Sequence, residues 1–232
     1  KSPSCTTSII ACSVAGGSNI YERCLAEFIG TGMIVHFGCG VCCSAMYAKS
    51  GISPFGQAFI WGSAVACAIF STRDVSGAHL NPAITASILV NRSDQFYGDP
   101  FKEAPAYILA QFAGATTAAA VNYTIFRHGI TTMEKNLGLI RGSPASTASY
   151  AGAFGLVPNP VLRLGLPTAL ISEAWMTGAF TYVIFGLTDP ETTVPTTMSP
   201  MLVGTTVVVF SGVFGTVTGC GMNPARDLGP RL

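Results

Sequence analysis

Long apolar stretches alternate with short polar connectors along this chain, and this pattern predicts a membrane protein built from helices. A helix that crosses a bilayer needs about 20 predominantly apolar residues. Five stretches approach that length: Ala26–Tyr47, Phe55–Ser71, Ala104–Phe126, Pro167–Leu187 and Pro200–Val217. We therefore expect an all-α membrane protein with five spans in this chain.

Two short segments depart from the pattern, SGAHLNPAIT at Ser76–Thr85 and GCGMNPARDL at Gly219–Leu228. In each, an Asn-Pro pair (Asn81–Pro82 and Asn223–Pro224) supplies an N-cap residue and a proline for the first helical position. Small residues precede each pair, and they allow an extended backbone that approaches its neighbours closely. A half-helix that begins at the midplane of a bilayer requires an irregular approach that is buried or lines a water-filled cavity. Two such segments predict a pore.

The two segments belong to an internal repeat. Asn81 follows Glu27 by 54 residues, and Asn223 follows Glu173 by 50. Both halves contain a carboxylate in one span, then a second span, then Asn-Pro-Ala. Because three spans precede the connector, the second half enters the membrane from the opposite side, which gives an inverted repeat. Strict symmetry then requires a sixth span after Leu232, which is absent from this chain.

The expected organisation follows from these assignments. Residues 1–22 form an N-terminal segment, and residues 23–126 form the first repeat, with three spans and a half-helix at 81–90. Residues 127–166 form an exposed inter-repeat loop rich in Gly, Ser and Pro. Residues 167–232 form the second repeat, truncated within its half-helix. Because the chain opens with Lys1 rather than Met, we expect that an N-terminal piece is missing.

Composition agrees with a multi-pass membrane protein and excludes other classes. Hydrophobic residues make up 49% of the chain, charged residues 10%, and the mean hydropathy is +0.49, whereas soluble domains contain about 25% charged residues. The net charge of +1 and the absence of a basic run give no reason to expect a nucleic-acid partner. We find no nucleophile–base pair, metal set or phosphate loop, so we expect neither an enzyme nor a cofactor. The lipid bilayer is the expected partner.

The half-helices suggest how a pore of this kind would select its solutes. If they meet head to head, each N-terminus places a dipole equivalent to roughly +0.5 charge at the midplane, which repels cations. The amides of Asn81 and Asn223 would each donate to the oxygen of a permeant molecule, and this interrupts a donor chain for protons. The preceding backbones would present a ladder of carbonyl acceptors, from Gly77, Ala78, His79, Gly219, Cys220 and Gly221.

The doubled Asn-Pro-Ala motif, with each copy preceded by a short glycine-containing segment, resembles the major intrinsic protein family of aquaporins and aquaglyceroporins. The resemblance covers most of residues 23–232. Three details are similar to the glycerol-facilitator branch: Asp227 follows Arg226, Trp61 lies twenty residues before Asn81, and RGSPASTASYAGAFGLVPNP resembles the branch's long loop. The resemblance implies the inverted-repeat aquaporin fold, with six transmembrane helices plus two half-helices that meet at the midplane. It also implies a homotetramer with one pore per subunit.

The resemblance further implies a selectivity constriction with a polar and an apolar wall. Arg226 would donate hydrogen bonds to the solute, and Trp61 would supply the apolar wall. The alternatives are an arginine that snorkels to the interface and a tryptophan of the interfacial belt. Ungapped counting from Arg226 places Ser211, or Gly212, at the remaining wall. Cys220 replaces a second aromatic residue of glycerol facilitators, so we expect a wider or more polar ring.

Several other polar residues allow two interpretations. Glu27 and Glu173 could form a proton relay, but the resemblance favours structural support for the half-helix loops, a role we also expect for Asp227. The cluster His36, Cys39, Cys42 and Cys43 could bind a soft metal, but small helix-packing residues are the favoured reading. Arg73 and Asp74 depart from the small neutral residues usual in the family, and at a pore mouth they could pair, gate or remain solvated, the last being favoured.

The sequence therefore predicts an integral, multi-pass membrane protein that acts as a passive channel. Its expected partners are water, glycerol and similar small neutral solutes, and it would exclude ions and protons. Two alternatives stay open: a water-selective aquaporin, and a non-conducting membrane scaffold that keeps the same fold. Asp227 and Trp61 argue against the first alternative.

Overall fold

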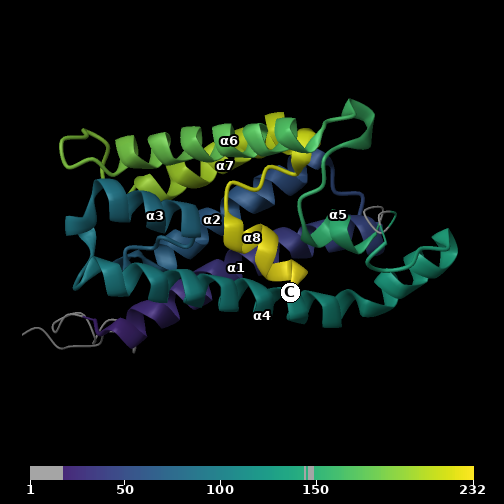
Figure 1. The fold of residues 1–232 in the computed structure, drawn as a ribbon, viewed down its shortest axis with the longest axis horizontal. Coiled ribbons are helices and arrows are strands. Elements are labelled where there is room, and N and C mark those ends of the chain that lie inside the picture. The colour runs from purple at the N-terminus through teal and green to yellow at the C-terminus, as the bar shows by residue number, and fades with distance from the viewer. Residues whose placement is uncertain (1–17, 144, 146–148) are drawn as a thin grey trace, which may run out of the picture.

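The computed structural model describes residues 18–143, 145 and 149–232, and helices dominate this part of the chain. The long helices run along the long axis of the molecule, and the short helices α3 and α8 lie between them (Figure 1). The α-helices are α1 (Ile20–Tyr47), α2 (Pro54–Ser76), α3 (Pro82–Asn91), α4 (Pro100–Leu137), α5 (Tyr150–Phe154), α6 (Leu166–Leu187), α7 (Ser199–Thr218) and α8 (Pro224–Leu228). The described residues also form short 3-10 turns, among them η2 (Ser93–Gln95), η4 (Pro160–Leu162) and η5 (Gly229–Arg231).

Each of the five expected spans is a helix. Four of them, α1, α2, α6 and α7, are long and apolar enough to cross a membrane. The first helix begins at Ile20, within the expected N-terminal segment, of which residues 1–17 lie outside the described part of the chain. The expected half-helix at 81–90 is α3, one residue later at each end.

The fourth helix is longer than expected, because α4 continues past Phe126 to Leu137. The loss of hydropathy at Arg127 marks the end of the apolar stretch but not the end of the helix. The stop signal is Gly138, which adopts a left-handed conformation and donates its N–H to the carbonyls of Glu134 and Lys135. The connector therefore begins as helix, and it contains α5 and η4 before α6 starts.

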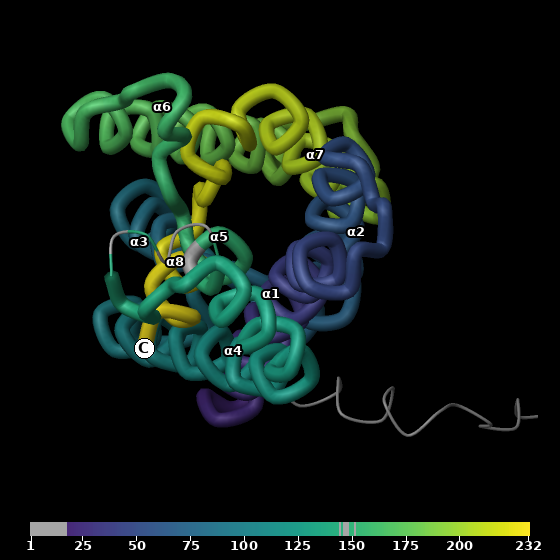
Figure 2. The backbone as a smooth tube through the Cα atoms, turned by 90° about the vertical axis from the view of Figure 1, so that its right-hand side faces the viewer, coloured from purple at the N-terminus to yellow at the C-terminus, as the bar shows by residue number. Residues whose placement is uncertain are grey.

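The long helices follow one another around a central axis in the order α6, α7, α2, α1 and α4 (Figure 2). The two half-helices occupy the remaining side, where α3 and α8 contact each other and also α4. This arrangement places both Asn-Pro pairs inside the helix ring.

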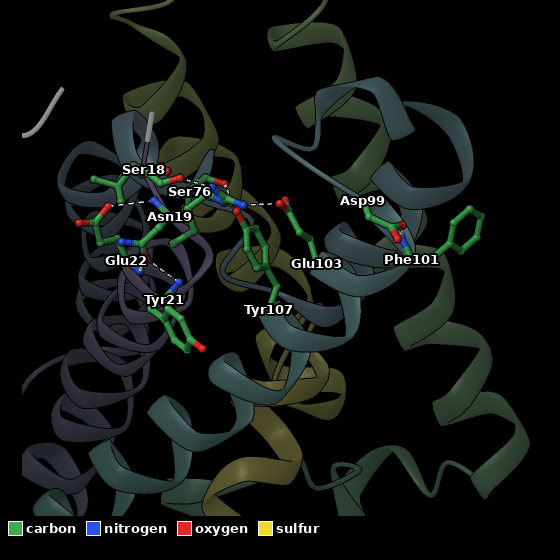
Figure 3. Close-up of polar contacts among 11 residues, drawn as sticks. Ser18, Asn19, Tyr21, Glu22, Ser76, Asp99, Phe101, Glu103 and Tyr107 are labelled. Atoms are coloured by element: carbon green, nitrogen blue, oxygen red, sulfur yellow. Dashed lines mark hydrogen bonds and ion pairs between the residues drawn. The ribbon is translucent and has the colours of Figure 1, made fainter. Parts of the chain in front are cut away.

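Capping and a buried ion pair fix the end of the molecule where α1 and α4 begin. The Asn19 side chain accepts hydrogen bonds from the N–H groups of Tyr21 and Glu22, and the Glu22 carboxylate accepts the N–H of Asn19 in return (Figure 3). Arg23, one residue further along, pairs with Glu103 on α4, and both side chains are buried. These contacts join the starts of two neighbouring spans.

Glycines let the long helices cross closely. An added Cβ at Gly114 of α4 would lie 2.1 Å from the Phe28 carbonyl oxygen of α1. The same holds where α2 crosses α7, because a Cβ at Gly62 would lie 2.3 Å from the Gly204 carbonyl oxygen. Close backbone approach at small residues is the usual way in which membrane helices gain packing energy. The two crossings hold together the helices that flank the passage.

We expect Gly114→Ala to destabilise the protein by about 1–3 kcal/mol, since the added methyl group meets rigid backbone. Gly178→Ala on α6 is the matched control, because a Cβ there has no atom within 4 Å. The measurement is the unfolding midpoint of each purified variant in detergent, followed by tryptophan fluorescence. Equal midpoints for the two variants would show that the α1–α4 crossing is looser than this structure.

Candidate functional site

A long cavity of about 990 Å³ runs through the helix ring. Its lining begins at Pro54, at the start of α2, and reaches Arg73 near the end of that helix. At 1.5 Å per residue, these positions are about 28 Å apart, close to the thickness of the hydrocarbon core. Asn81 and Asn223 both line the cavity between these ends. The geometry is that of a passage through the membrane.

The two half-helices meet at their N-termini through reciprocal hydrogen bonds. The Asn81 amide nitrogen donates to the Met222 carbonyl at 2.7 Å, and the Asn223 amide nitrogen donates to the Leu80 carbonyl at 2.8 Å. Each amide oxygen accepts the N–H two residues further on, from Ala83 at 2.9 Å and from Ala225 at 3.0 Å. Each half-helix thus begins with an asparagine cap, and each cap also binds the opposite approach segment.

These contacts fix the orientation of both amides. A side-chain amide has two N–H donors, and the opposite approach segment takes one of them in each asparagine. The second N–H of each amide remains for a molecule in the cavity. Two donors from opposite sides of the midplane can therefore hold one oxygen as an acceptor.

The approach segments are not regularly extended, contrary to the expectation from the sequence. Ala78 and Leu80 in the first repeat, and Cys220 and Met222 in the second, have φ between 50° and 53°. Left-handed residues at alternate positions bring successive N–H groups to the same side, which creates an anion-binding concavity. Such conformations cost roughly 1–3 kcal/mol each in non-glycine residues, so the surrounding structure must maintain them.

Glu27 supplies that support in the first repeat. Its fully buried carboxylate accepts the N–H groups of His79 at 2.9 Å and Leu80 at 2.7 Å. The Ser76 hydroxyl and the Gln111 amide donate to it as well, at 2.6 and 2.7 Å. Because a trans peptide directs its N–H and its C=O to opposite sides, the carbonyls of the same peptides point away from Glu27.

Glu173 has the same place in the second repeat. Its carboxylate accepts the N–H of Gly221 at 3.0 Å, the N–H of Met222 at 3.2 Å, and the Thr218 hydroxyl. Both carboxylates therefore sit behind an approach segment. The carbonyls on the other side of these peptides belong to residues that line the cavity. They are the carbonyls of Ala78 and His79 in the first repeat and of Cys220 and Gly221 in the second.

Ser76, Thr218, Gln111 and Tyr107 extend this support, and the sequence analysis did not single them out. The Tyr107 hydroxyl donates to the Ser76 carbonyl at 3.1 Å (Figure 3). A signal for two of the residues was present, because Ser76 and Thr218 both stand five residues before the asparagine of their repeat. Gln111 and Tyr107 lie on α4, far from either motif, so only the fold reveals their role.

Asp227 holds the connector against the second half-helix. Its Oδ1 accepts the Leu156 N–H at 2.8 Å and the Arg231 Nε–H at 2.9 Å. The connector continues past Leu156, where the N–H of Val157 donates to the Thr218 carbonyl at 2.9 Å. The chain between the repeats is thereby fastened beside the cavity, which Gly155 helps to line.

Arg226 and Trp61 contact each other inside the cavity. The Arg226 guanidinium carbon lies 4.4 Å from the centre of the Trp61 ring, and Arg226 is only 6% exposed. Its Nη1 is buried without a hydrogen-bond partner among the described residues. Gly38 makes room for the ring, because a Cβ there would lie 2.2 Å from it. The arginine therefore presents an unused donor beside an aromatic surface.

The other expected constriction residues also line the cavity. Ser211 and Cys220 line the passage, and so does Gly212. Cys42 is a lining residue that the sequence assigns only to a cysteine cluster, and it packs with Trp61 against the same buried core cluster. The signal for it is its spacing, since Cys42 follows Gly38 by one helical turn on the face toward Trp61.

The structure does not bring the His36, Cys39, Cys42 and Cys43 cluster together as a metal site. Cys39 and Cys43 are buried in the core, with the Cys39 thiol 4.0 Å from the Phe154 carbonyl. His36 lies instead in a separate outer groove with Phe37 and Asn122. Within the described residues, no three His, Cys, Asp or Glu side chains gather where they could hold a metal ion.

Apolar spans, two half-helices that meet head to head and a continuous lined passage define the class of the protein. It is a polytopic α-helical membrane protein of the channel type, built from two repeats.

Comparison with known proteins gives the family. A model of the family described as "Major intrinsic protein" matches residues 16–232. The chain belongs to the major intrinsic protein family, whose members are channels rather than enzymes.

Within this family, the chain is similar to several curated facilitator proteins and to one solved structure. A glycerol uptake facilitator of Escherichia coli K12 is 38% identical over 219 residues, covering 93% of this chain and 74% of the relative. The glycerol uptake facilitator of Pseudomonas aeruginosa is 36% identical over 215 residues, covering 92% and 74%. A propanediol uptake facilitator of Salmonella typhimurium is 34% identical, covering 92% and 78%. The solved structure of the Plasmodium falciparum aquaglyceroporin matches with a TM-score of 0.74 and 25% identity, covering 92% of this chain and 80% of that one.

Proposed function

We propose that this protein is a passive channel for water and small neutral polyhydroxyl solutes such as glycerol, and that it excludes ions and protons. The observation that carries the proposal is the Arg226–Trp61 pair inside a continuous passage. A polyol has hydroxyl groups along one edge and C–H groups along the other. The guanidinium would donate to the hydroxyls, and the indole would contact the C–H groups.

The distribution of charge supports the exclusion of cations. Helix α3 directs its N-terminus at the midplane, and its dipole there is equivalent to roughly half a positive charge. Helix α8 has only five residues, so the charge on that side comes mainly from the Arg226 side chain. A cation would meet positive potential at both places without a facing carboxylate, because Glu27 and Glu173 lie behind the approach segments and do not line the cavity.

The reciprocal asparagines support the exclusion of protons. Each amide has one N–H left for the cavity, so a water molecule at the midplane would accept hydrogen bonds from both sides. An oxygen held in this way directs its own hydrogens away from the midplane in both directions, and this interrupts proton hopping along a water file. The carbonyls of the approach segments, which point away from Glu27 and Glu173, would then accept hydrogen bonds from the solute as it moves along the passage.

The relatives' names support glycerol and propanediol as solutes, and the constriction supports a wider range. Cys220 and Ser211 are small, and they contribute a thiol and a hydroxyl to the lining of the passage that also contains the Arg226–Trp61 pair. We therefore propose that urea and four-carbon polyols also pass. The limit would be set by the space between Trp61 and these two side chains.

Stopped-flow light scattering of proteoliposomes tests this proposal. We expect water, glycerol, urea and erythritol each to enter faster than they enter empty liposomes. Fast water flux without glycerol flux would assign the protein to the water-selective alternative. If no solute enters faster than in empty liposomes, although the protein is inserted and monodisperse, the scaffold alternative replaces the channel.

A further inference from the structure

The passage contains a second arginine, at the end opposite the constriction. Arg73 lines the cavity near the end of α2, and its side chain is 27% exposed. Trp61 lies twelve residues earlier on the same helix, about 18 Å away along its axis. The midplane asparagines therefore separate Arg73 from the constriction. The sequence favours a solvated Arg73, but in the structure its guanidinium contacts a backbone carbonyl and a carboxylate.

Arg73 binds the loop between α6 and α7. Its Nη1 donates to the Thr196 carbonyl at 2.8 Å, and its Nε lies 3.5 Å from the Asp74 carboxylate. The guanidinium has five N–H donors, and within the described part of the chain Nη2 has no hydrogen-bond partner. The Thr196 contact holds the planar group at the wall of the cavity. The Nη2 donors are thus positioned and unused.

Acceptors and further donors surround this end of the cavity. Asp189 and Thr192, from the same loop, line it, and so does Gln95 from η2. Asp189 is oriented by Arg92, whose Nη2 lies 3.3 Å from Oδ2. We call these lining residues, Arg73, Gln95, Asp189, Thr192 and Thr196, the Arg73 mouth.

We propose that the Arg73 mouth is a second binding station for neutral polyhydroxyl solutes, in which Arg73 and Asp189 contact the solute directly. The inference rests on the proposed function, since it concerns the solute of that channel. Each hydroxyl group of a polyol both donates and accepts a hydrogen bond. A mouth with a fixed cationic donor, an anionic acceptor and neutral hydroxyls satisfies both capacities.

The balance of charge selects against ions at this station. Arg73 and Asp189 carry opposite charges, so an ion drawn to one side chain is repelled by the other. A neutral solute meets no such penalty, and hydrogen bonds to charged partners are roughly twice as strong as those between neutral groups. Polyols would therefore concentrate at the mouth before they enter the passage.

Arg73 could instead act only by holding the α6–α7 loop in place, and Arg92 allows the two roles to be separated. Arg92 anchors the beginning of the same loop, through the Phe185 carbonyl at 3.0 Å and the Thr188 hydroxyl at 3.1 Å. Unlike Arg73, it does not line the cavity. Arg92→Gln therefore loosens the loop and releases Asp189 from one ion pair, but it leaves both the Arg73 donor and the Asp189 carboxylate in the mouth.

The test compares the concentration dependence of glycerol flux in proteoliposomes that contain the wild type, Arg73→Gln or Arg92→Gln. We expect Arg73→Gln to raise the half-saturating glycerol concentration about three- to tenfold, because glutamine replaces a charged donor by a neutral one that makes a weaker hydrogen bond. Water flux should change less than twofold in the same vesicles. Arg92→Gln, which keeps both Arg73 and Asp189 in the mouth, should raise the half-saturating concentration by less than twofold. Thr192→Val, which removes only a hydroxyl group, should raise it about twofold.

Two results would overturn the station. One is an unchanged half-saturating concentration in both Arg73→Gln and Thr192→Val. The other is a shift in Arg92→Gln equal to that in Arg73→Gln, which would show that Arg73 only holds the loop. The absence of glycerol flux in the wild type is a separate result, because it contradicts the proposed function whatever the variants do.

Discussion

Glu27→Ala is expected to abolish solute flux and to cause the largest loss of stability of any single substitution in the passage. The change leaves the N–H groups of His79 and Leu80 buried without an acceptor, at a cost of about 1–3 kcal/mol each. It also frees the Ser76 hydroxyl and the Gln111 amide from their partner. The left-handed residues of the approach segment would relax, and the segment would collapse into the passage.

The control is Glu22→Ala, a loss of the same side chain from the same helix at an exposed position. Glu22 contributes to a helix cap, so we expect a cost of about 1 kcal/mol and normal flux. Glu173→Ala should be intermediate, since Glu173 is only partly buried and accepts from two N–H groups and one hydroxyl. Monodispersity in detergent and water flux in liposomes are measured for all three. Wild-type flux in Glu27→Ala would show that the approach segment keeps its shape without the carboxylate.

Arg226→Ala is expected to make the passage leak protons and small cations. At an effective dielectric constant of 20, a unit positive charge repels a cation 4 Å away by about 4 kcal/mol. Each 1.4 kcal/mol removed from the barrier raises the rate of passage about tenfold. We therefore expect the proton conductance to rise at least about tenfold. Glycerol should lose its main donor at the constriction, so the ratio of glycerol flux to water flux should fall by about fivefold.

The measurement is the decay of an imposed pH gradient, reported by a dye inside proteoliposomes, with water and glycerol flux recorded in the same preparation. Arg127→Ala is the control, because Arg127 is an exposed arginine on α4. Arg226→Ala vesicles that hold the gradient as long as the wild type would show that the charge of Arg226 is not part of the barrier. The half-helix dipole and the asparagines would then have to supply it.

Much of the architecture could be predicted from local chemistry. The five apolar stretches became helices, and the bounds of α6 and α7 lie within one residue of those expected, because span length is set by the bilayer. Asn81 and Asn223 cap half-helices, since an asparagine before a proline is a strong helix start in any setting. The inverted repeat was visible in the order of carboxylate, span and Asn-Pro-Ala.

Other features depend on contacts that no local pattern contains. The length of α4 depends on Gly138 and the cap it forms, which hydropathy alone does not report. The left-handed residues of the approach segments depend on the carboxylates behind them, about 50 residues away in sequence. The sequence near Arg73 predicts a solvated side chain, because its partner, the Thr196 carbonyl, comes from the other repeat and is not visible in any local pattern.

The central claim is that one passage in this protein conducts neutral polyhydroxyl solutes without conducting protons. The most direct test loads proteoliposomes with a pH-sensitive dye and applies a glycerol gradient and a pH gradient together. The account predicts glycerol entry well above that of empty liposomes, with decay of the pH gradient at the rate of empty liposomes. Glycerol entry no faster than in empty liposomes, or glycerol entry accompanied by rapid loss of the pH gradient, would contradict it.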